Sequence, residues 1–131
     1  MAYEGHQHHV PAAAWFAGLG GDRVRFCRFT QIGFLRLLTH PNVMQKDVRS
    51  QTEAWKAYDL FLQDERVSYQ EESDGEQVEA ALRKLTSGRG SSSKQWPDAY
   101  LVAFAHVAGL TLVTFDRGVR HMAAGEALLL P

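Results

Sequence analysis

The stretch WPDAYLVAFAHVAGLTLVTFDRG, residues 96–118, decides the fold of this 131-residue chain. Pro97 suits the first position of a helix, where its missing N–H costs no hydrogen bond, and Gly109 is a typical helix end. Residues 110–114 form a short β-rich run that suits a buried strand. The stretch therefore predicts a helix followed by a strand, with one aspartate in the first helical turn and another just past the strand.

Those aspartates, Asp98 and Asp116, are the candidate functional residues. Three apolar residues follow Asp98 at i+3, i+4 and i+7, which places its carboxylate at the open end of a buried stripe: Leu101, Val102 and Ala105. In a right-handed parallel α/β unit, the helix before a strand begins at the edge where that strand ends, so the two carboxylates are expected to meet there. Converging carboxylates can hold a hard divalent cation. Alternatively, Asp98 is only a helix-start residue and Asp116 an ordinary turn residue.

Length and composition indicate one soluble globular domain, because 45% of the residues are hydrophobic and 22% are charged. The single cysteine, Cys27, has no partner for a disulfide, which predicts a reducing, cytoplasmic location. No signal peptide or membrane span is expected.

The formal net charge of −1 gives no global basic field for nucleic acid. A local basic rim is one interpretation of five arginines that flank the predicted edge, and scattered solvated arginines are the other: Arg25, Arg28, Arg36, Arg117 and Arg120.

Alternating helix and strand patterns run through the rest of the chain. We expect helices at 11–17, 31–38, 50–62 and 75–85, and strands at 23–29, 66–69 and 127–130. Thr30 is the expected N-cap of the second helix. The third helix is expected to bury Trp55, Tyr58, Leu60 and Phe61. The core is expected to include Trp15, Phe34, Leu35, Leu101, Val102 and Val113. This order predicts an α/β fold with a parallel sheet, a pattern that a receiver-like or flavodoxin-like fold also shares.

Several segments resemble the PIN domain, specifically the VapC-like toxins of bacterial type II toxin–antitoxin pairs. Residues 96–101, WPDAYL, resemble the family's hxhTDAYLhALA stretch, and residues 112–118, LVTFDRG, resemble LhTFDRG. Residues 30–38, TQIGFLRLL, resemble hTEhGFLRLL. The spacing of His6, His9 and Trp15 resembles the family's first helix.

The resemblance implies a single PIN-like domain over residues 1–131, a three-layer fold with a central parallel sheet flanked by helices. It implies a metal-dependent endoribonuclease toxin that cleaves RNA and is neutralised by a cognate antitoxin, in some members as a homodimer. Asp98 and Asp116 would be the catalytic metal ligands for Mg²⁺ or Mn²⁺. Beside the resemblance, the charge and planar fork of Arg117 suit bidentate binding of a substrate phosphate, and an ordinary surface ion pair is the alternative.

Two departures from the family pattern qualify this expectation. Gln31 stands where many members carry a metal-site glutamate. The family's opening strand, which ends in a metal-binding aspartate, does not precede the helix that starts near His6, so we expect the central first strand to be missing and activity to be weak. Two alternatives follow: a catalytically impaired PIN-like module that only binds a protein partner, and an unrelated α/β binding module.

Overall fold

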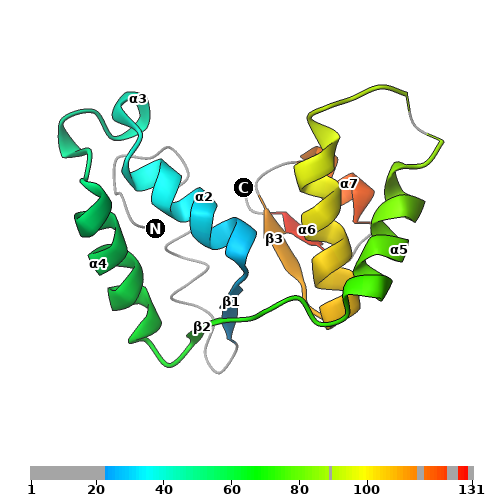
Figure 1. The fold of residues 1–131 in the computed structure, drawn as a ribbon, viewed down its shortest axis with the longest axis horizontal. Coiled ribbons are helices and arrows are strands. Elements are labelled where there is room, and N and C mark those ends of the chain that lie inside the picture. Colours follow the sequence, from blue (N-terminus) through cyan, green and yellow to red (C-terminus); the bar gives the residue numbers. More distant parts are fainter. Residues whose placement is uncertain (1–22, 89, 115–116, 124–126, 130–131) are drawn as a thin grey trace. The chain divides into compact units, whose positions relative to one another are not determined.

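The computed structural model describes residues 23–88, 90–114, 117–123 and 127–129. The chain divides into two compact units, residues 1–71 and 72–131, and each is described by itself. Figure 1 shows the helices and strands of both units. The expectation of a single domain over residues 1–131 stays a prediction.

The first unit pairs two short parallel strands and packs helices against them. The strands are β1 (Val24–Phe26) and β2 (Val67–Tyr69), in a register that pairs Val24 with Val67 and Phe26 with Tyr69. Between them run α2 (Arg28–Leu38), α3 (Pro41–Met44), the 3₁₀ helix η1 (Gln45–Asp47) and α4 (Gln51–Leu62). A parallel pair needs such a crossover, and the helices of this one supply the core.

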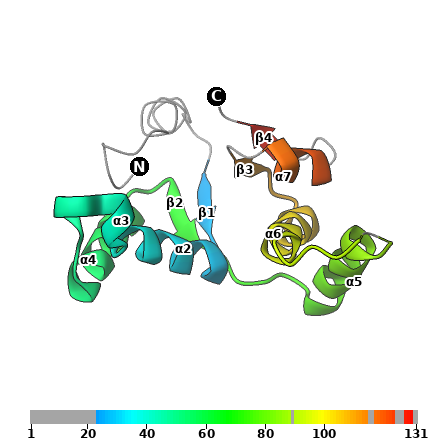
Figure 2. The same ribbon diagram turned by 90° about the horizontal axis from the view of Figure 1, so that it is seen from above.

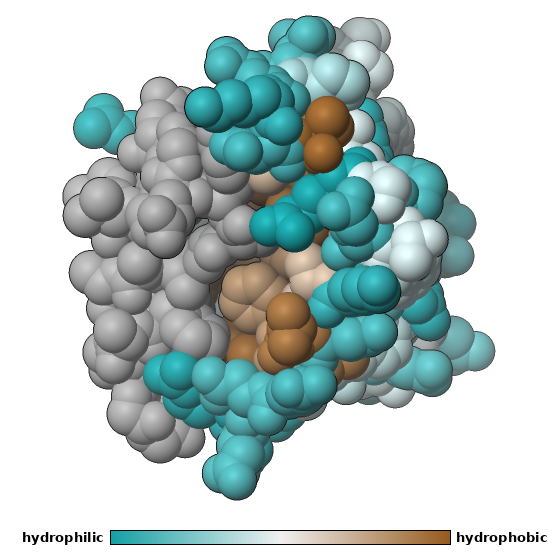
Figure 3. Space-filling model, turned by 90° about the vertical axis from the view of Figure 1, so that its left-hand side faces the viewer, coloured by the Kyte–Doolittle hydropathy of each residue, from teal (hydrophilic) through white to brown (hydrophobic). Residues whose placement is uncertain are grey.

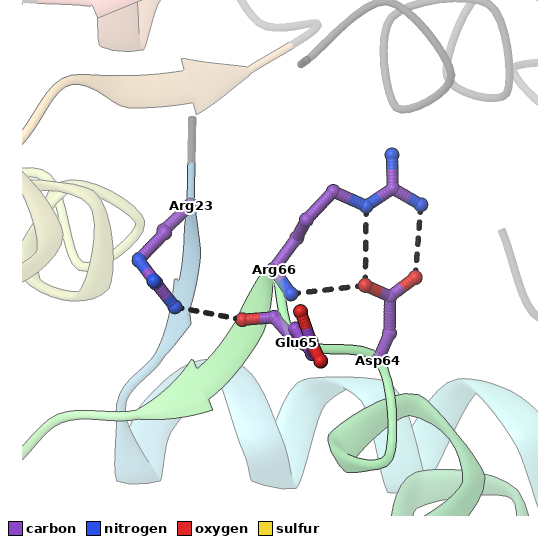
Figure 4. Close-up of polar contacts among 4 residues, drawn as sticks. All are labelled: Arg23, Asp64, Glu65 and Arg66. Atoms are coloured by element: carbon purple, nitrogen blue, oxygen red, sulfur yellow. Dashed lines mark hydrogen bonds and ion pairs between the residues drawn. The ribbon is translucent and has the colours of Figure 1, made fainter. Parts of the chain in front are cut away.

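Backbone hydrogen bonds and three charged side chains set this register. The Val24 amide donates to the Arg66 carbonyl at 2.6 Å, and the Arg23 guanidinium donates to the Glu65 carbonyl at 2.8 Å. Arg66 also donates from its backbone amide and from two guanidinium nitrogens to the Asp64 carboxylate, at 2.8–3.1 Å (Figure 4). The turn before β2 is thereby fixed at the start of β1.

Helix α2 begins earlier than the sequence pattern predicts. The strand ends at Phe26 rather than at residue 29, Cys27 is the N-cap, and the expected cap Thr30 is instead the third helical residue. The reason is local hydrogen bonding: the Thr30 hydroxyl accepts from the Cys27 amide at 2.9 Å. In a capping box, the side chain of the third helical residue accepts a hydrogen bond from the backbone amide of the N-cap residue. Thr30 fills this role toward Cys27.

Helix α4 starts as predicted but buries a different set of side chains. Ser50 caps it through a reciprocal pair of hydrogen bonds with Glu53, at 3.0 and 3.1 Å. Tyr58 is buried and Phe61 is half-buried, whereas Leu60 is 65% exposed and Trp55 is 47% exposed. The prediction was wrong for Leu60 and Trp55. The buried stripe of α4 consists of Ala54, Tyr58 and Phe61, at i, i+4 and i+7, and neither of those two residues lies on it.

The core of the first unit lies between α2, α3 and α4. Leu38, Met44 and Ala54 are buried there, and half-buried apolar residues pack against them: Phe34, Leu35, Val43 and Ala57. An edge-to-face aromatic cluster continues this core to β1, with ring centroids 5.7 Å apart for Phe26 and Phe34 and 5.4 Å apart for Phe26 and Tyr58.

The second unit also contains a parallel strand pair. It consists of α5 (Gly75–Thr86), α6 (Gln95–Ala108), β3 (Leu112–Thr114), α7 (Arg117–Met122) and β4 (Ala127–Leu129). Leu112 pairs with Ala127 and Thr114 with Leu129. Helices α5 and α6 lie side by side (Figure 2). Buried residues of α6 and of the α7 region form the core: Ala99, Val102, Val119, Met122 and Ala123.

Helix α6 begins two residues earlier than predicted, at Gln95, so Pro97 is its third residue rather than its first. Proline is still tolerated there because the first four N–H groups of a helix have no partner within the helix. The predicted end is confirmed: Gly109 adopts a left-handed conformation with φ of 69°.

The two parallel strand pairs with their helices confirm the predicted α/β class. Among the expected core residues, Val102 is buried, and Phe34, Leu35, Leu101 and Val113 are half-buried. Trp15 lies outside the described residues, as do His6 and His9. None of the described helices is long and apolar enough to cross a membrane.

Candidate active site

Asp98 lies where the sequence predicts, at the open end of the buried stripe of α6. It is half-buried in the first helical turn, and Val102 and Ala105 on the same stripe are 5% and 6% exposed. The N-cap of the helix is Lys94, whose side chain makes no capping hydrogen bond. Asp98 lies in the first turn of the helix, where the helix dipole favours a negative charge.

The second predicted carboxylate, Asp116, lies outside the described residues. Strand β3 is described up to Thr114 and α7 from Arg117 onward. The close approach of Asp98 and Asp116 therefore stays a prediction. Within the residues that the structure describes, no three His, Cys, Asp or Glu side chains gather as a metal site would require.

Arg117, the predicted phosphate-binding residue, is exposed at the start of α7. Arg120 and His121 in the last turn of the same helix are exposed as well. The role of Arg117 stays a prediction.

Two aromatic residues lie near Asp98 in the sequence of α6, but at a spacing of two residues their side chains face away from it: Trp96 and Tyr100. Trp96, two residues before Asp98, is 58% exposed. Tyr100 donates its hydroxyl hydrogen to Glu72 at 3.1 Å and lies against Phe104, with ring centroids 6.2 Å apart. The bond to Glu72 fixes the first turns of α6 to the segment that precedes α5.

Comparison with known proteins identifies the family. The sequence model of the PIN domain matches residues 1–125. The chain belongs to the PIN-domain family. It is 38% identical over 135 residues to Ribonuclease VapC41 of Mycobacterium tuberculosis, covering 99% of this chain and 91% of that protein. It is 30% identical over 126 residues to Ribonuclease VapC38 of the same species, covering 91% of this chain and 79% of that protein. The predicted resemblance to VapC-like proteins is confirmed.

Gln31, which stands where the resemblance led us to expect a metal-site glutamate, is 6% exposed. Its Oε1 accepts a hydrogen bond from Nη1 of Arg28 at 2.6 Å. The guanidinium carbon of Arg28 lies 4.9 Å from the ring centroid of Tyr69. The amide oxygen of Gln31 therefore already binds a cation of the protein itself.

The arginines of the PIN domain's first unit do not all flank one edge. Arg28 opens α2 directly after β1, whereas Arg36 is in the last turn of the same helix. Eight residues of helix place the two about 12 Å apart along the axis, so Arg36 is not at the carboxyl end of β1. Arg25 lies within β1 and donates to the hydroxyl of Ser68, its pairing partner on β2. Of the three arginines of this unit that were predicted to flank the edge, Arg28 alone lies at the carboxyl end of β1.

Proposed function

We propose that this PIN domain is a metal-dependent endoribonuclease toxin that cleaves RNA in the cytoplasm. The observation that carries the proposal is the half-buried Asp98 at the open end of the α6 stripe, in a chain that is 38% identical to a protein named as a ribonuclease. Asp98 sits in a sequence segment, WPDAYL, whose family counterpart carries an acidic metal ligand.

Mg²⁺ or Mn²⁺ is the proposed cofactor, with Asp98 and Asp116 as its protein ligands. The fit rests on donor chemistry, because carboxylate oxygens are the ligands that these hard cations prefer, and Asp98 presents one from a rigid helix. A bound cation of this kind stabilises charge on phosphoryl oxygens and activates water. Arg117 would contact a phosphate of the substrate through its planar, charged fork.

The partner that we propose is a cognate antitoxin protein, and the oligomeric state that we propose is a homodimer. Both are supported by exposed apolar side chains in the first unit: Phe29, Ile32, Val48, Trp55, Leu60 and Leu62. Figure 3 shows hydrophobic residues exposed among hydrophilic ones on one side of the molecule. Exposed apolar surface of this kind is typical of protein interfaces.

Cleavage of a labelled single-stranded RNA by the purified chain tests the proposal. We expect cleavage with Mg²⁺ or Mn²⁺ that EDTA stops, and its loss in Asp98→Asn. The matched control is Asp59→Asn, which changes the same functional groups at an exposed position of α4 and is expected to retain full activity. Full activity of Asp98→Asn would exclude Asp98 as a metal ligand.

A catalytically impaired module that only binds a protein partner is the second candidate. It is favoured by Gln31, a neutral amide at the usual glutamate position whose oxygen is bound to Arg28. A well-folded chain that forms a complex with an antitoxin but leaves RNA intact at every Mg²⁺ or Mn²⁺ concentration would support this second function over the first.

A further inference from the structure

Arg28 is fixed from two sides at the carboxyl end of the β1–β2 pair. It is the first residue of α2, directly after β1, and Tyr69 is the last residue of β2. The strands are parallel, so both residues lie at the same end of the pair. The Tyr69 ring lies under the guanidinium at 4.9 Å, and the Gln31 amide oxygen holds Nη1 at 2.6 Å. This arginine therefore has far less rotational freedom than an ordinary surface side chain.

The charge of Arg28 is not neutralised by any carboxylate in the part of the chain that the structure describes. The ion pairs found there join Arg66 to Asp64 and Arg83 to Glu79. Arg28 is exposed, and only one of its five N–H donors is used by Gln31. A pre-oriented, exposed guanidinium of this kind matches the geometry of a phosphate group.

Gln31 explains how this charge is kept. A glutamate at the same place would form an ion pair with Arg28 and cancel its charge, whereas the amide orients the guanidinium and leaves the charge intact. A metal cation bound to the same oxygen would be repelled by the guanidinium, whose Nη1 lies at 2.6 Å from it. The geometry thus gives Gln31 a positioning role toward Arg28 rather than a metal-binding one.

We propose that Arg28 binds a phosphate of the RNA strand, oriented for this by Gln31 and Tyr69. The inference rests on the proposed ribonuclease function, because that function supplies the polyanionic ligand. It assigns to the usual glutamate position of this chain a contribution to substrate binding in place of a contribution to the metal site.

The test is binding of a fluorescently labelled single-stranded RNA in EDTA, measured by anisotropy over a range of salt concentrations. EDTA prevents metal-dependent cleavage and isolates the contribution of protein cations. We expect Arg28→Gln to weaken binding about tenfold, the effect of losing one charge-assisted contact. The slope of log K against log salt should fall by about 0.7, the value for one phosphate contact on a single strand. The control Arg36→Gln removes the same charge from the same helix and is expected to change neither.

Two further variants keep the proposal testable if Arg28→Gln is poorly folded. Gln31→Glu has nearly the same shape and is expected to weaken RNA binding in EDTA, because it neutralises Arg28. Arg28→Lys keeps the charge but loses the planar fork, so the salt slope should persist while affinity falls several-fold. Thermal unfolding of each variant shows whether it is folded.

Three outcomes distinguish the possibilities. Equal RNA binding by the wild type, Arg28→Gln and Gln31→Glu would overturn the inference, even with metal-dependent cleavage intact. A Gln31→Glu variant that binds Mn²⁺ more tightly and RNA in EDTA unchanged would show that Gln31 belongs to the metal site, and would also overturn it. Binding that depends on Arg28, without any cleavage by the wild type, would support the inference and contradict the proposed catalytic function.

Discussion

The Thr30 hydroxyl both accepts a hydrogen bond from the Cys27 amide, at 2.9 Å, and donates one to the Cys27 carbonyl, at 3.1 Å. With this pair of bonds, Cys27 is the single residue between the end of β1 and the start of α2. Because α2 starts at Arg28, that arginine and Gln31 one turn later come to lie on one side of the helix, where they bond to each other. A threonine at the third helical position thus determines where the proposed phosphate-binding group is placed.

Replacing Thr30 with valine keeps the shape of the side chain and removes both hydrogen bonds. We expect the free energy of unfolding to fall by about 1 kcal/mol, the typical contribution of a capping interaction at a helix start. Urea denaturation measures it, and Thr52→Val in the exposed first turn of α4 is the control. Equal stability of the two variants would show that the Thr30 bonds contribute nothing measurable.

The start of α2 also shows where reading the sequence failed. Residues 23–29 alternate in polarity, and threonine is a common N-cap, so the pattern predicts a longer strand and a later helix. The pattern does not reveal that the Thr30 hydroxyl bonds backward to residue 27, since that depends on the conformation of the chain. The start of helix α4 was predicted correctly from the amphipathic pattern of residues 50–62, and the structure adds a capping box between Ser50 and Glu53.

Gly109 is required by the conformation of the chain, whereas Gly33 is not. Gly109 ends α6 with φ of 69°. Gly33 lies inside α2, where a methyl group in place of its hydrogen would meet no neighbouring atom within 4 Å. We expect Gly109→Ala to destabilise the protein by about 1 kcal/mol and Gly33→Ala to stabilise it by about 0.5–1 kcal/mol. Thermal or urea unfolding of the two variants should therefore give shifts of opposite sign, and shifts of the same sign would contradict the assigned backbone conformations.

Leu38 and Leu60 test the packing of the first unit. Leu38 has 0% exposure within the α2–α3–α4 core, whereas Leu60 on α4 is 65% exposed. We expect Leu38→Ala to lower the free energy of unfolding by about 2–5 kcal/mol through lost burial and a cavity. Leu60→Ala should change it by less than about 0.5 kcal/mol. A large loss in Leu60→Ala would mean that this side chain is buried in solution, by a partner or a second copy.

The Arg66 guanidinium lowers the pKa of Asp64 to about 2 by donating hydrogen bonds to its carboxylate, and the Arg66 backbone amide adds to the effect. A depressed folded-state pKa means that this contribution to stability is fully present above the ordinary aspartate pKa and is lost as the pH falls through about 2. We therefore expect the wild type to be more stable than Asp64→Asn at pH 7. The difference should shrink below about pH 4 and vanish near the folded-state value. Urea unfolding at a series of pH values measures it, and a difference that does not depend on pH would rule out this origin.

The candidate site could be predicted only in part. The helical phase of Asp98 relative to Val102 and Ala105 follows from spacing alone, and burial of those two residues agrees with it. The bond between Arg28 and Gln31 could not be predicted, because many rotamers of two long side chains are compatible with a spacing of three residues. Trp55 and Leu60 were wrongly predicted to be buried, because every apolar residue of the helix was assigned to the core. The structure buries only a narrower stripe of α4, the one that α2 and β1 cover.

Asp98 gives a prediction that does not depend on catalysis. A cation that binds the folded protein and not the unfolded chain stabilises it, by about 2.7 kcal/mol when its free concentration is a hundred times the dissociation constant. We expect Mn²⁺ to raise the Tm of the wild type in a concentration-dependent way, and to leave the Tm of Asp98→Asn nearly unchanged. Asp59→Asn, which removes an exposed carboxylate from α4, is expected to respond like the wild type. Comparing each variant's Tm with and without Mn²⁺ separates this effect from any stability that the asparagine itself costs. A Mn²⁺-dependent rise in Tm of equal size in all three proteins would show that the cation binds elsewhere, and Asp98 would then have no part in holding it.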